Sequence, residues 1–345
     1  MKLKKDNTLY QEDLNRILQT KGIERLKEKS ILLSGGTGLI GLCLVDALMK
    51  YNKTGAGIKM YVIGRNMEKA ASRLGEYFDS PFFCFIEQDV RQPLPDDLKV
   101  DYIIPLASNT HPLAYSRFPI ETIEINVKGV VNVLKKACDC GAEILYPSSV
   151  EIYGNARGNE VFLEQDTGVL DLSTSRSCYT ESKRVCEALC QSYMDEKKVN
   201  VKIIRLCRVF GPTMIESDSK ASSQFIKNAL MGEDIILKSA GNQYYSYMYV
   251  ADAVSAILHV MLNGETGKPY NISSSTCNIH LKEFAQTCAR TVSRNVIVQL
   301  PSVMESKGFS IATKALLDNT RLMDTGWNPR YDYEMAIERT IKILK

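Results

Sequence analysis

The stretch at residues 34–41, Ser-Gly-Gly-Thr-Gly-Leu-Ile-Gly, constrains the fold of this 345-residue chain more than any other. It follows a short apolar run and precedes an apolar helical pattern at 42–49. Strand, glycine-rich turn and helix in this order typically bind the pyrophosphate of a dinucleotide. Gly35 permits a tight turn, Gly38 permits close approach of the phosphates, and Gly41 lets the helix pack on the sheet. An ordinary glycine-rich connection is the alternative, and the remaining residues have to distinguish the two.

Extended and helical patterns alternate downstream of this turn. Apolar extended runs fall at 59–64, 82–87, 102–106, 143–147 and 201–206. Helical patterns fall at 67–78, at 120–140 and from residue 177 onward. This alternation predicts an α/β fold, a doubly wound parallel sheet of the Rossmann type with helices on both faces. The pattern becomes irregular after Pro212, which predicts a smaller C-terminal α/β lobe.

We therefore expect three parts in the chain. Residues 1–29 form an N-terminal helical extension that packs on the surface or on a partner subunit. Residues 30–206 form a nucleotide-binding domain of the Rossmann type, and residues 247–262 return to it. Residues 207–345 form a smaller lobe, which is interleaved with the first domain.

Composition and charge limit the classes of partner. A net charge of +3 without a dense basic block predicts neither nucleic acid nor an anionic membrane as a partner. No apolar run approaches the ~18 residues of a membrane span. The first residues turn polar at once, without a signal-peptide core, so the ten cysteines predict reduced thiols in a cytoplasmic protein. Only three, widely spaced histidines are present, and we expect no metal site.

Tyr179 and Lys183 form the strongest chemical signal. They are four residues apart in a predicted helix, so both side chains can point into one site. A free tyrosine has a pKa near ~10 and is a poor base at neutral pH. A cation about 4 Å away contributes roughly 4 kcal/mol at an effective dielectric constant of ~20, equivalent to about three pKa units. The alternative is an exposed pair of the kind common on helix surfaces.

A second signal, Ser149 and Glu151, follows the predicted strand at 143–147. Ligands of open α/β sheets bind beyond the carboxyl ends of the strands. The hydroxyl of Ser149 can hydrogen-bond a substrate oxygen, and Glu151 can present a carboxylate beside it. A strand-end cap followed by a solvated glutamate is the alternative.

With these three motifs, the chain from about residue 30 onward resembles the extended short-chain dehydrogenase/reductase family, specifically the NAD-dependent epimerase/dehydratase family of nucleotide-sugar enzymes. Similar residues also fall at Arg205, Pro212, Gln224, Phe225, Tyr249 to Asp252, Gly326 and Trp327. The resemblance implies that residues 30–206 are an NAD(P)-binding Rossmann domain and that residues 207–345 are a substrate-binding lobe, which closes over a nucleotide sugar. It also implies a homodimer formed through helices that include the one carrying Tyr179.

The resemblance also implies the residues of the site. The catalytic residues would be Ser149, Glu151, Tyr179 and Lys183. The cofactor would contact Gly35, Thr37, Gly38, Leu39, Ile40, Gly41, Arg65, Asp89, Val90, Ala107, Ser108, Asn126, Tyr179 and Lys183. The substrate would contact Thr110, Ser149, Arg208, Lys220, Gln224 and Tyr245.

In the mechanism that the resemblance implies, Tyr179 takes the proton of the sugar 4-hydroxyl while hydride leaves carbon 4 for the nicotinamide. Ser149 orients the 4-oxygen, and Lys183 lowers the pKa of the tyrosine and holds the ribose. The resulting 4-ketone enables a second step, after which the hydride can return.

The second step separates the subfamilies. Ser149-Val150-Glu151 is similar to the hydroxyl-x-Glu pattern of UDP-glucuronate decarboxylases, whereas Val150 stands where dTDP-glucose-type 4,6-dehydratases have an aspartate. We therefore favour a UDP-glucuronate decarboxylase-like enzyme. A 4,6-dehydratase or a 4-epimerase is the alternative, and an NADPH-dependent ketone reductase or a non-catalytic nucleotide-sensing protein is a further one.

Three positions bear on the choice of ligand. Arg208 replaces an asparagine that is usual in the family, and Tyr245 replaces an arginine that clamps the diphosphate. We hypothesise that Arg208 supplies the cation that position 245 lacks. No acidic residue follows the second strand, where Arg65 could accept a 2′-phosphate, so we place NADP slightly ahead of NAD.

Overall fold

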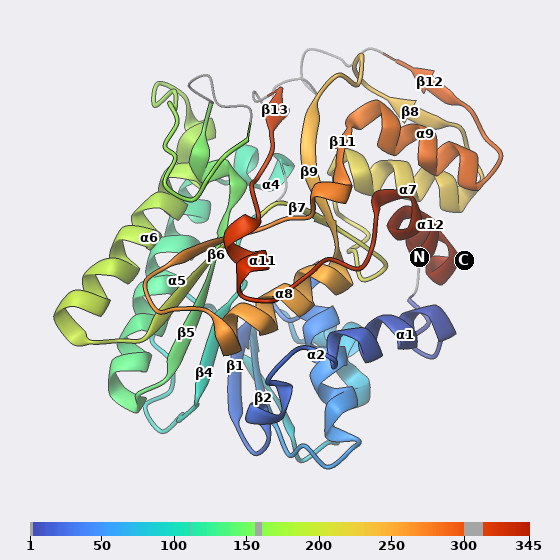
Figure 1. Cartoon of the computed structure of the whole chain (residues 1–345). Coiled ribbons are helices and arrows are strands. Elements are labelled where there is room, and N and C mark those ends of the chain that lie inside the picture. Colours follow the sequence, from blue (N-terminus) through green and yellow to red (C-terminus); the bar gives the residue numbers. More distant parts are fainter. Residues whose placement is uncertain (1–2, 111, 156–160, 300–312) are drawn as a thin grey trace.

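The computed structural model describes residues 3–110, 112–155, 161–299 and 313–345 (Figure 1). Its central feature is a seven-stranded sheet, in the order β10-β6-β5-β4-β1-β2-β3, whose neighbouring strands are all parallel. The strands are β1 (Ser30–Ser34), β2 (Lys59–Gly64), β3 (Phe83–Glu87), β4 (Tyr102–Pro105), β5 (Glu143–Ser149), β6 (Val201–Leu206) and β10 (Pro269–Ile272). This sheet confirms the predicted Rossmann-type fold.

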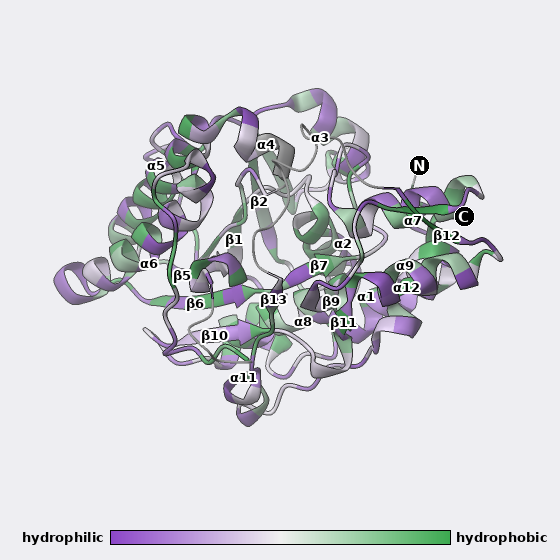
Figure 2. Ribbon diagram, turned by 90° about the horizontal axis from the view of Figure 1, so that it is seen from above, coloured by the Kyte–Doolittle hydropathy of each residue, from purple (hydrophilic) through white to green (hydrophobic). Residues whose placement is uncertain are grey.

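Helices cover both faces of this sheet. Successive side chains of a strand point to opposite faces, and both faces are buried. Ile31 and Leu33 of β1 belong to one hydrophobic cluster, whereas Leu32 belongs to the other. The first cluster includes residues of α2 and α8, and the second includes residues of α5 and α6. The helices of this domain are α2 (Leu39–Asn52), α3 (Met67–Leu74), α4 (Pro112–Arg117), α5 (Pro119–Cys140), α6 (Cys178–Lys197) and α8 (Val250–Asn263). In Figure 2, hydrophobic and hydrophilic residues alternate along α5 and α6, as expected for helices that bury one side.

The C-terminal part of the chain builds smaller sheets beside the first. In one, β9 pairs with β11, β13 and β7, and in the other β8 pairs with β12. These strands are β7 (Arg208–Phe210), β8 (Ile235–Leu237), β9 (Tyr244–Tyr249), β11 (Asn278–His280), β12 (Val296–Val298) and β13 (Lys314–Ala315). The accompanying helices are α7 (Ala221–Met231), α9 (Leu281–Thr291), α11 (Thr320–Asp324) and α12 (Tyr333–Leu344).

The chain crosses between its two halves more often than the sequence suggests. Helix α8 contacts the central sheet, but β9, which precedes it, lies in the second sheet. Strand β10 then returns to the edge of the central sheet beside β6. We did not expect this seventh strand, because its four residues include a proline and show no alternating pattern. The predicted domain boundaries stay a prediction.

The N-terminal helix α1 (Thr8–Ile17) lies against α2, α8 and α12, so that the two ends of the chain are close together (Figure 1). Its buried Asp13 accepts hydrogen bonds from the hydroxyls of Tyr249 at 2.5 Å and Tyr331 at 2.6 Å, and from Arg339 Nη2 at 2.7 Å. Tyr249 ends β9 and Arg339 lies in α12, so Asp13 joins the N-terminal helix to the C-terminal part of the chain. None of the described helices is long and apolar enough to cross a membrane.

Candidate active site

A cavity of about 1160 Å³ opens at the carboxyl ends of β1, β4 and β5 and extends to the C-terminal sheets. The position agrees with the rule for open α/β sheets, because β1 pairs with both β2 and β4 and the strand order reverses there. The cavity wall includes Tyr115, Tyr247 and Gln243, which the sequence did not predict as site residues. The predicted residues that line it are Gly35, Thr37, Gly38, Leu39, Ile40, Gly41, Arg65, Val90, Ala107, Ser108, Thr110, Ser149, Glu151, Tyr179, Lys183, Arg208, Lys220, Gln224 and Tyr245.

The glycine-rich turn has the geometry that a bound pyrophosphate requires. Gly35 has a φ of +74°, and a side chain there would meet the backbone nitrogen of Ala107 at 2.9 Å. A Cβ atom on Gly41 would overlap the carbonyl oxygen of Gly35 and lie 2.7 Å from the Cα of Gly36. Gly38 is the N-cap of α2 and provides no side-chain cap, so the first N–H groups of the helix face the cavity wall. These residues fit the diphosphate of a nicotinamide dinucleotide.

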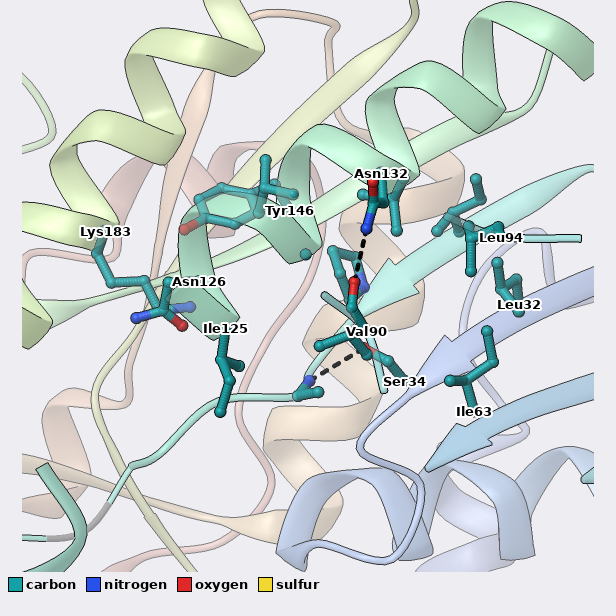
Figure 3. A pocket seen from close by; sticks show the side chains of 16 residues that line it. Leu32, Ser34, Ile63, Val90, Leu94, Ile125, Asn126, Asn132, Tyr146 and Lys183 are labelled. Carbon is teal, nitrogen blue, oxygen red and sulfur yellow. Dashed lines mark hydrogen bonds between the residues drawn. The ribbon is translucent and has the colours of Figure 1, made fainter. Parts of the chain in front are cut away.

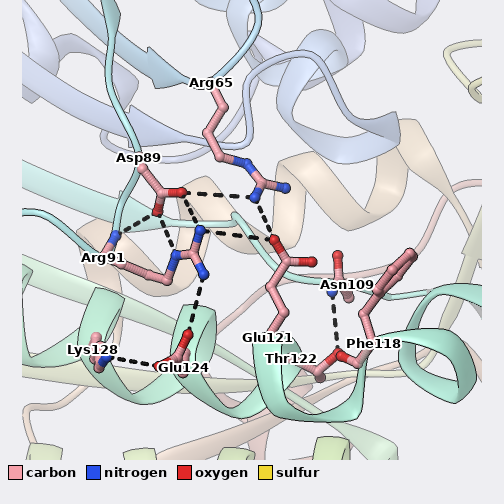
Figure 4. Close-up of polar contacts among 9 residues, drawn as sticks. All are labelled: Arg65, Asp89, Arg91, Asn109, Phe118, Glu121, Thr122, Glu124 and Lys128. Atoms are coloured by element: carbon pink, nitrogen blue, oxygen red, sulfur yellow. Dashed lines mark hydrogen bonds and ion pairs between the residues drawn. The ribbon is translucent and has the colours of Figure 1, made fainter.

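Asp89 and Arg65 belong to a charged cluster beside the end of β2 (Figure 4). Arg65 Nη1 lies 2.6 Å from Glu121 Oε1 and 3.7 Å from Asp89 Oδ2. Asp89 also accepts hydrogen bonds from the backbone and the guanidinium of Arg91, which lower the pKa of the Asp89 carboxyl. Arg65 lines the cavity, whereas Asp89 lies behind it and acts on Arg65.

Asn126 also lies behind the cavity wall. It accepts a hydrogen bond from Ser108 Oγ at 2.7 Å and donates one to Ser182 Oγ at 2.8 Å. With Tyr146 and Lys183 it borders a separate small cavity of about 20 Å³ beneath the site (Figure 3). Asn126 therefore links the strand end at Ser108 to the helix that carries Tyr179.

Tyr179 and Lys183 both lie buried in the first turns of α6 and line the large cavity. Lys183 Nζ donates a hydrogen bond to the carbonyl oxygen of Pro147 at 2.8 Å, at the end of β5. Burial lowers the pKa of Lys183 to about 8. Burial also raises the pKa of Tyr179 to about 12, although a hydrogen bond with Ser149 acts in the opposite direction. The predicted lowering of the tyrosine pKa by Lys183 stays a prediction.

Glu151 lies in the short 3₁₀ helix Val150–Tyr153, directly after β5, and two arginines flank it. Its Oε2 is 3.3 Å from Arg176 Nη2, and its Oε1 is 3.5 Å from Arg208 Nη2. The guanidinium carbon of Arg208 lies 3.6 Å from the ring centroid of Tyr245. The two residues that depart from the family pattern, at 208 and 245, are therefore in direct contact.

The remaining predicted substrate residues lie on the other side of the cavity. Lys220 Nζ is 3.5 Å from Asp218 Oδ2, and Gln224 Nε2 donates to the carbonyl oxygen of Asp218 at 3.3 Å. The sequence analysis missed Arg176 and Tyr115. Arg176 comes three residues before Tyr179, which is a signal that could have been used, whereas nothing in the sequence around Tyr115 indicates its place in the site.

The described residues contain no group of three or more histidines, cysteines and acidic residues that could hold a metal ion. A doubly wound sheet with a glycine-rich turn and a buried Tyr–Lys pair defines a nicotinamide-dependent enzyme of the short-chain dehydrogenase/reductase class. The chain belongs to the NAD dependent epimerase/dehydratase family, whose model matches residues 31–273. It is a nucleotide-sugar-modifying enzyme that depends on NAD or NADP.

Curated relatives and solved structures agree with this assignment. The chain is 33% identical over 270 residues to UDP-glucuronic acid decarboxylase 5 of Arabidopsis thaliana, covering 78% of this chain and 76% of the relative. It is 29% identical over 317 residues to UDP-glucuronic acid decarboxylase 1 of Xenopus tropicalis, covering 92% of this chain and 72% of the relative. The fold is similar to UDP-glucose 4-epimerase of Thermotoga maritima, with a TM-score of 0.76, 20% identity and coverage of 91% and 98%. It is also similar to dTDP-glucose 4,6-dehydratase of Bacillus anthracis in complex with NAD, with a TM-score of 0.74, 19% identity and coverage of 91% and 96%.

Proposed function

We propose that the protein is a UDP-glucuronate decarboxylase-like enzyme, which oxidises the sugar at carbon 4 and then releases the carboxyl group as carbon dioxide. The observation that carries this proposal is the placement of Glu151 next to Ser149, in the same cavity as Tyr179. The similarity to curated UDP-glucuronic acid decarboxylases supports the choice of substrate.

The roles of the chain's own residues follow from this arrangement. When bound, the nicotinamide cofactor supplies reversible hydride acceptance. Tyr179 takes the proton of the 4-hydroxyl, and Ser149, which hydrogen-bonds the tyrosine, orients the 4-oxygen. Lys183 provides the positive charge that favours the phenolate. Because a 4-keto uronate loses carbon dioxide without a departing hydroxyl, no acid is needed at position 150, where the buried Val150 stands. Loss of carbon dioxide leaves an enolate that takes up one proton at carbon 5, and Glu151, in the same cavity, can take this proton from water and pass it on as the carboxylic acid.

The remaining predicted contacts belong to the same proposal. The glycine-rich turn, Arg65, Val90, Ala107 and Ser108 hold the cofactor, with Asp89 and Asn126 supporting the wall from behind. Lys220 and Gln224 hold the nucleotide sugar from the side of the C-terminal lobe, residues 207–345, and Thr110 holds it from the loop after β4.

The choice between NADP and NAD depends on the cavity wall after β2. Arg65, Asn66 and Lys69 line it there, and none of the three is acidic. Arg65 is about half exposed, so its ion pair with Glu121 is worth little and a 2′-phosphate can replace it. We therefore place NADP slightly ahead of NAD. Titrating both cofactors against the wild type and Arg65→Gln tests this, because only the affinity for NADP should fall.

The test of the reaction is incubation of the protein with UDP-, GDP-, dTDP- and CDP-sugars, with the product masses measured. Release of the mass of carbon dioxide from UDP-glucuronate supports the proposal. Loss of one water from a hexose would instead indicate a 4,6-dehydratase. A product of unchanged mass but altered chromatographic retention would indicate a 4-epimerase. Tyr179→Phe should abolish turnover in each case.

The proposal also includes a homodimer in the cytoplasm. Exposed apolar side chains lie on the outer surface of α5 and α6, where Ile120, Ile123 and Val185 are 75%, 44% and 46% exposed. Light scattering should give the mass of two chains, and Ile123→Asp should reduce it to that of one. All ten cysteines are free thiols, which suits a reducing compartment.

A further inference from the structure

Arg208 begins β7 and reaches the cavity from the side of the C-terminal sheets. Its guanidinium stacks on the ring of Tyr245 at 3.6 Å and forms a long ion pair with Glu151 Oε1 at 3.5 Å. The other terminal nitrogen of Arg208, Nη1, is buried and has no hydrogen-bond partner among the described residues. A buried donor without an acceptor is costly, so this nitrogen is suited to an acceptor that a ligand brings.

Arg176 likewise pairs with Glu151, through the other carboxylate oxygen, and lies over a tyrosine ring. Its Nη2 lies 3.3 Å from Glu151 Oε2, and its guanidinium carbon lies 4.4 Å from the ring centroid of Tyr115. Its Nε is also buried without a partner among the described residues. Two guanidinium groups thus share one carboxylate, which leaves one positive charge to be balanced by an anion.

We propose that Arg208 binds the carboxylate of the uronate sugar, and that Glu151 then keeps only its pair with Arg176. This inference rests on the proposed function and names the residue that selects its substrate. The planar guanidinium can bind both oxygens of a carboxylate, and the stacked ring of Tyr245 fixes its plane. When the substrate carboxylate takes Arg208, Glu151 Oε1 is released for the sugar.

The location of the cluster favours the sugar carboxylate over the diphosphate. Tyr115, which carries Arg176 on its ring, stacks on Tyr179 with their ring centroids 5.8 Å apart. Two charged groups of this cluster act electrostatically on Tyr179, because Glu151 raises the pKa of its phenol and Arg176 lowers it. The cluster therefore surrounds the position of the sugar 4-hydroxyl. The carboxylate is attached to the adjacent carbon 5, whereas the diphosphate leaves from carbon 1 across the ring.

The test is calorimetric titration of the cofactor-loaded protein with UDP-glucuronate, UDP-glucose and UDP. Wild type should bind UDP-glucuronate more tightly than UDP-glucose. Arg208→Gln should weaken UDP-glucuronate about 10- to 100-fold and leave UDP-glucose and UDP within twofold. Arg208→Lys keeps the charge and should recover part of the loss. Arg290→Gln, which removes an exposed arginine paired with Glu334, is the matched control and should change nothing.

Two results would overturn the inference. Equal weakening of all three ligands by Arg208→Gln would place the arginine at the diphosphate, and a wild type without preference for the uronate would show that no carboxylate subsite exists. The melting temperature of each variant shows that it is folded, and Arg208→Lys serves if the glutamine variant is not. Product masses distinguish this failure from that of the proposed function. If wild type releases carbon dioxide from UDP-glucuronate but Arg208→Gln binds UDP-glucuronate as tightly as wild type, only the inference is refuted. If wild type prefers UDP-glucuronate but releases no carbon dioxide, only the decarboxylase activity is refuted.

Discussion

The ammonium group of Lys183 lies 5.9 Å from the ring centroid of Tyr179 while it donates a hydrogen bond to the carbonyl oxygen of Pro147. One helix thus presents a phenol and an ammonium group to the same cavity, and the end of β5 holds the ammonium group in place. The pKa of Tyr179 is raised to about 12 and that of Lys183 lowered to about 8, both by burial. At pH 7 the tyrosine is therefore a neutral phenol and the lysine an ammonium group.

The pKa of Lys183 predicts how activity falls at alkaline pH. Because the folded-state pKa is lowered, the ammonium form is present below about pH 8 and is lost as the pH rises through that value. Turnover that needs the cation should therefore decline above about pH 8 in the profile of kcat/KM. In Lys183→Arg the rate should be lower, but the decline should move to higher pH, because a guanidinium stays charged to pH ~12. An unchanged decline in this variant would contradict the assignment.

Ser149→Ala should reduce turnover with little effect on substrate affinity. The hydroxyl accepts a hydrogen bond from the backbone nitrogen of Glu151 at 3.2 Å and hydrogen-bonds Tyr179. Removing one oriented donor of this kind typically lowers kcat about 10²- to 10³-fold. Steady-state kinetics of the mutant give kcat and KM separately. Ser192→Ala, on the same helix as Tyr179 but exposed to solvent, is the control and should behave as wild type; a mainly raised KM in Ser149→Ala would argue for a binding role instead.

Gly41→Ala should strongly weaken cofactor binding. The added methyl group would overlap the carbonyl oxygen of Gly35 and lie 2.7 Å from Gly36 Cα, so the turn and the helix must separate. Fluorescence titration with NADP and NAD should show a loss of at least about tenfold, together with a lower melting temperature. Gly75→Ala provides the matched control, because its φ is −57° and a Cβ atom there meets nothing within 4 Å. Cofactor affinity unchanged by Gly41→Ala would mean that the turn does not hold the diphosphate.

The sequence was informative wherever one local pattern determines the structure. The spacing of Gly35 and Gly41 predicted the turn because each glycine is required by backbone geometry, and the i, i+4 spacing of Tyr179 and Lys183 placed both in one cavity. The edge strand β10 and the role of Tyr115 were not predictable in this way. Both depend on residues far apart in the sequence, since β10 is defined only by its pairing with β6 and Tyr115 by its stacking on Tyr179.

Arg208 and Tyr245 show the same limit at the level of chemistry. Each departure from the family pattern is visible in the sequence, and their compensation was a hypothesis. Their stacking at 3.6 Å could not be read from a separation of 37 positions, because it depends on the parallel pairing of β7 with β9. The pairing sets Arg208 beside Tyr247 and so brings it near the residue two positions earlier.

Asp13→Ala tests how firmly the N-terminal helix is held to the C-terminal part of the chain. The carboxylate is buried and accepts hydrogen bonds from Tyr249, Tyr331 and Arg339, so its removal leaves a buried cation and two hydroxyls without their acceptor. Chemical denaturation should show a loss of about 3–5 kcal/mol in the free energy of unfolding. Glu12→Ala, one residue away, removes a carboxylate that is 48% exposed and pairs with the same arginine, and it should cost less than about 1 kcal/mol. A loss for Asp13→Ala as small as that for Glu12→Ala would show that the buried carboxylate and its three donors do not hold α1 in place.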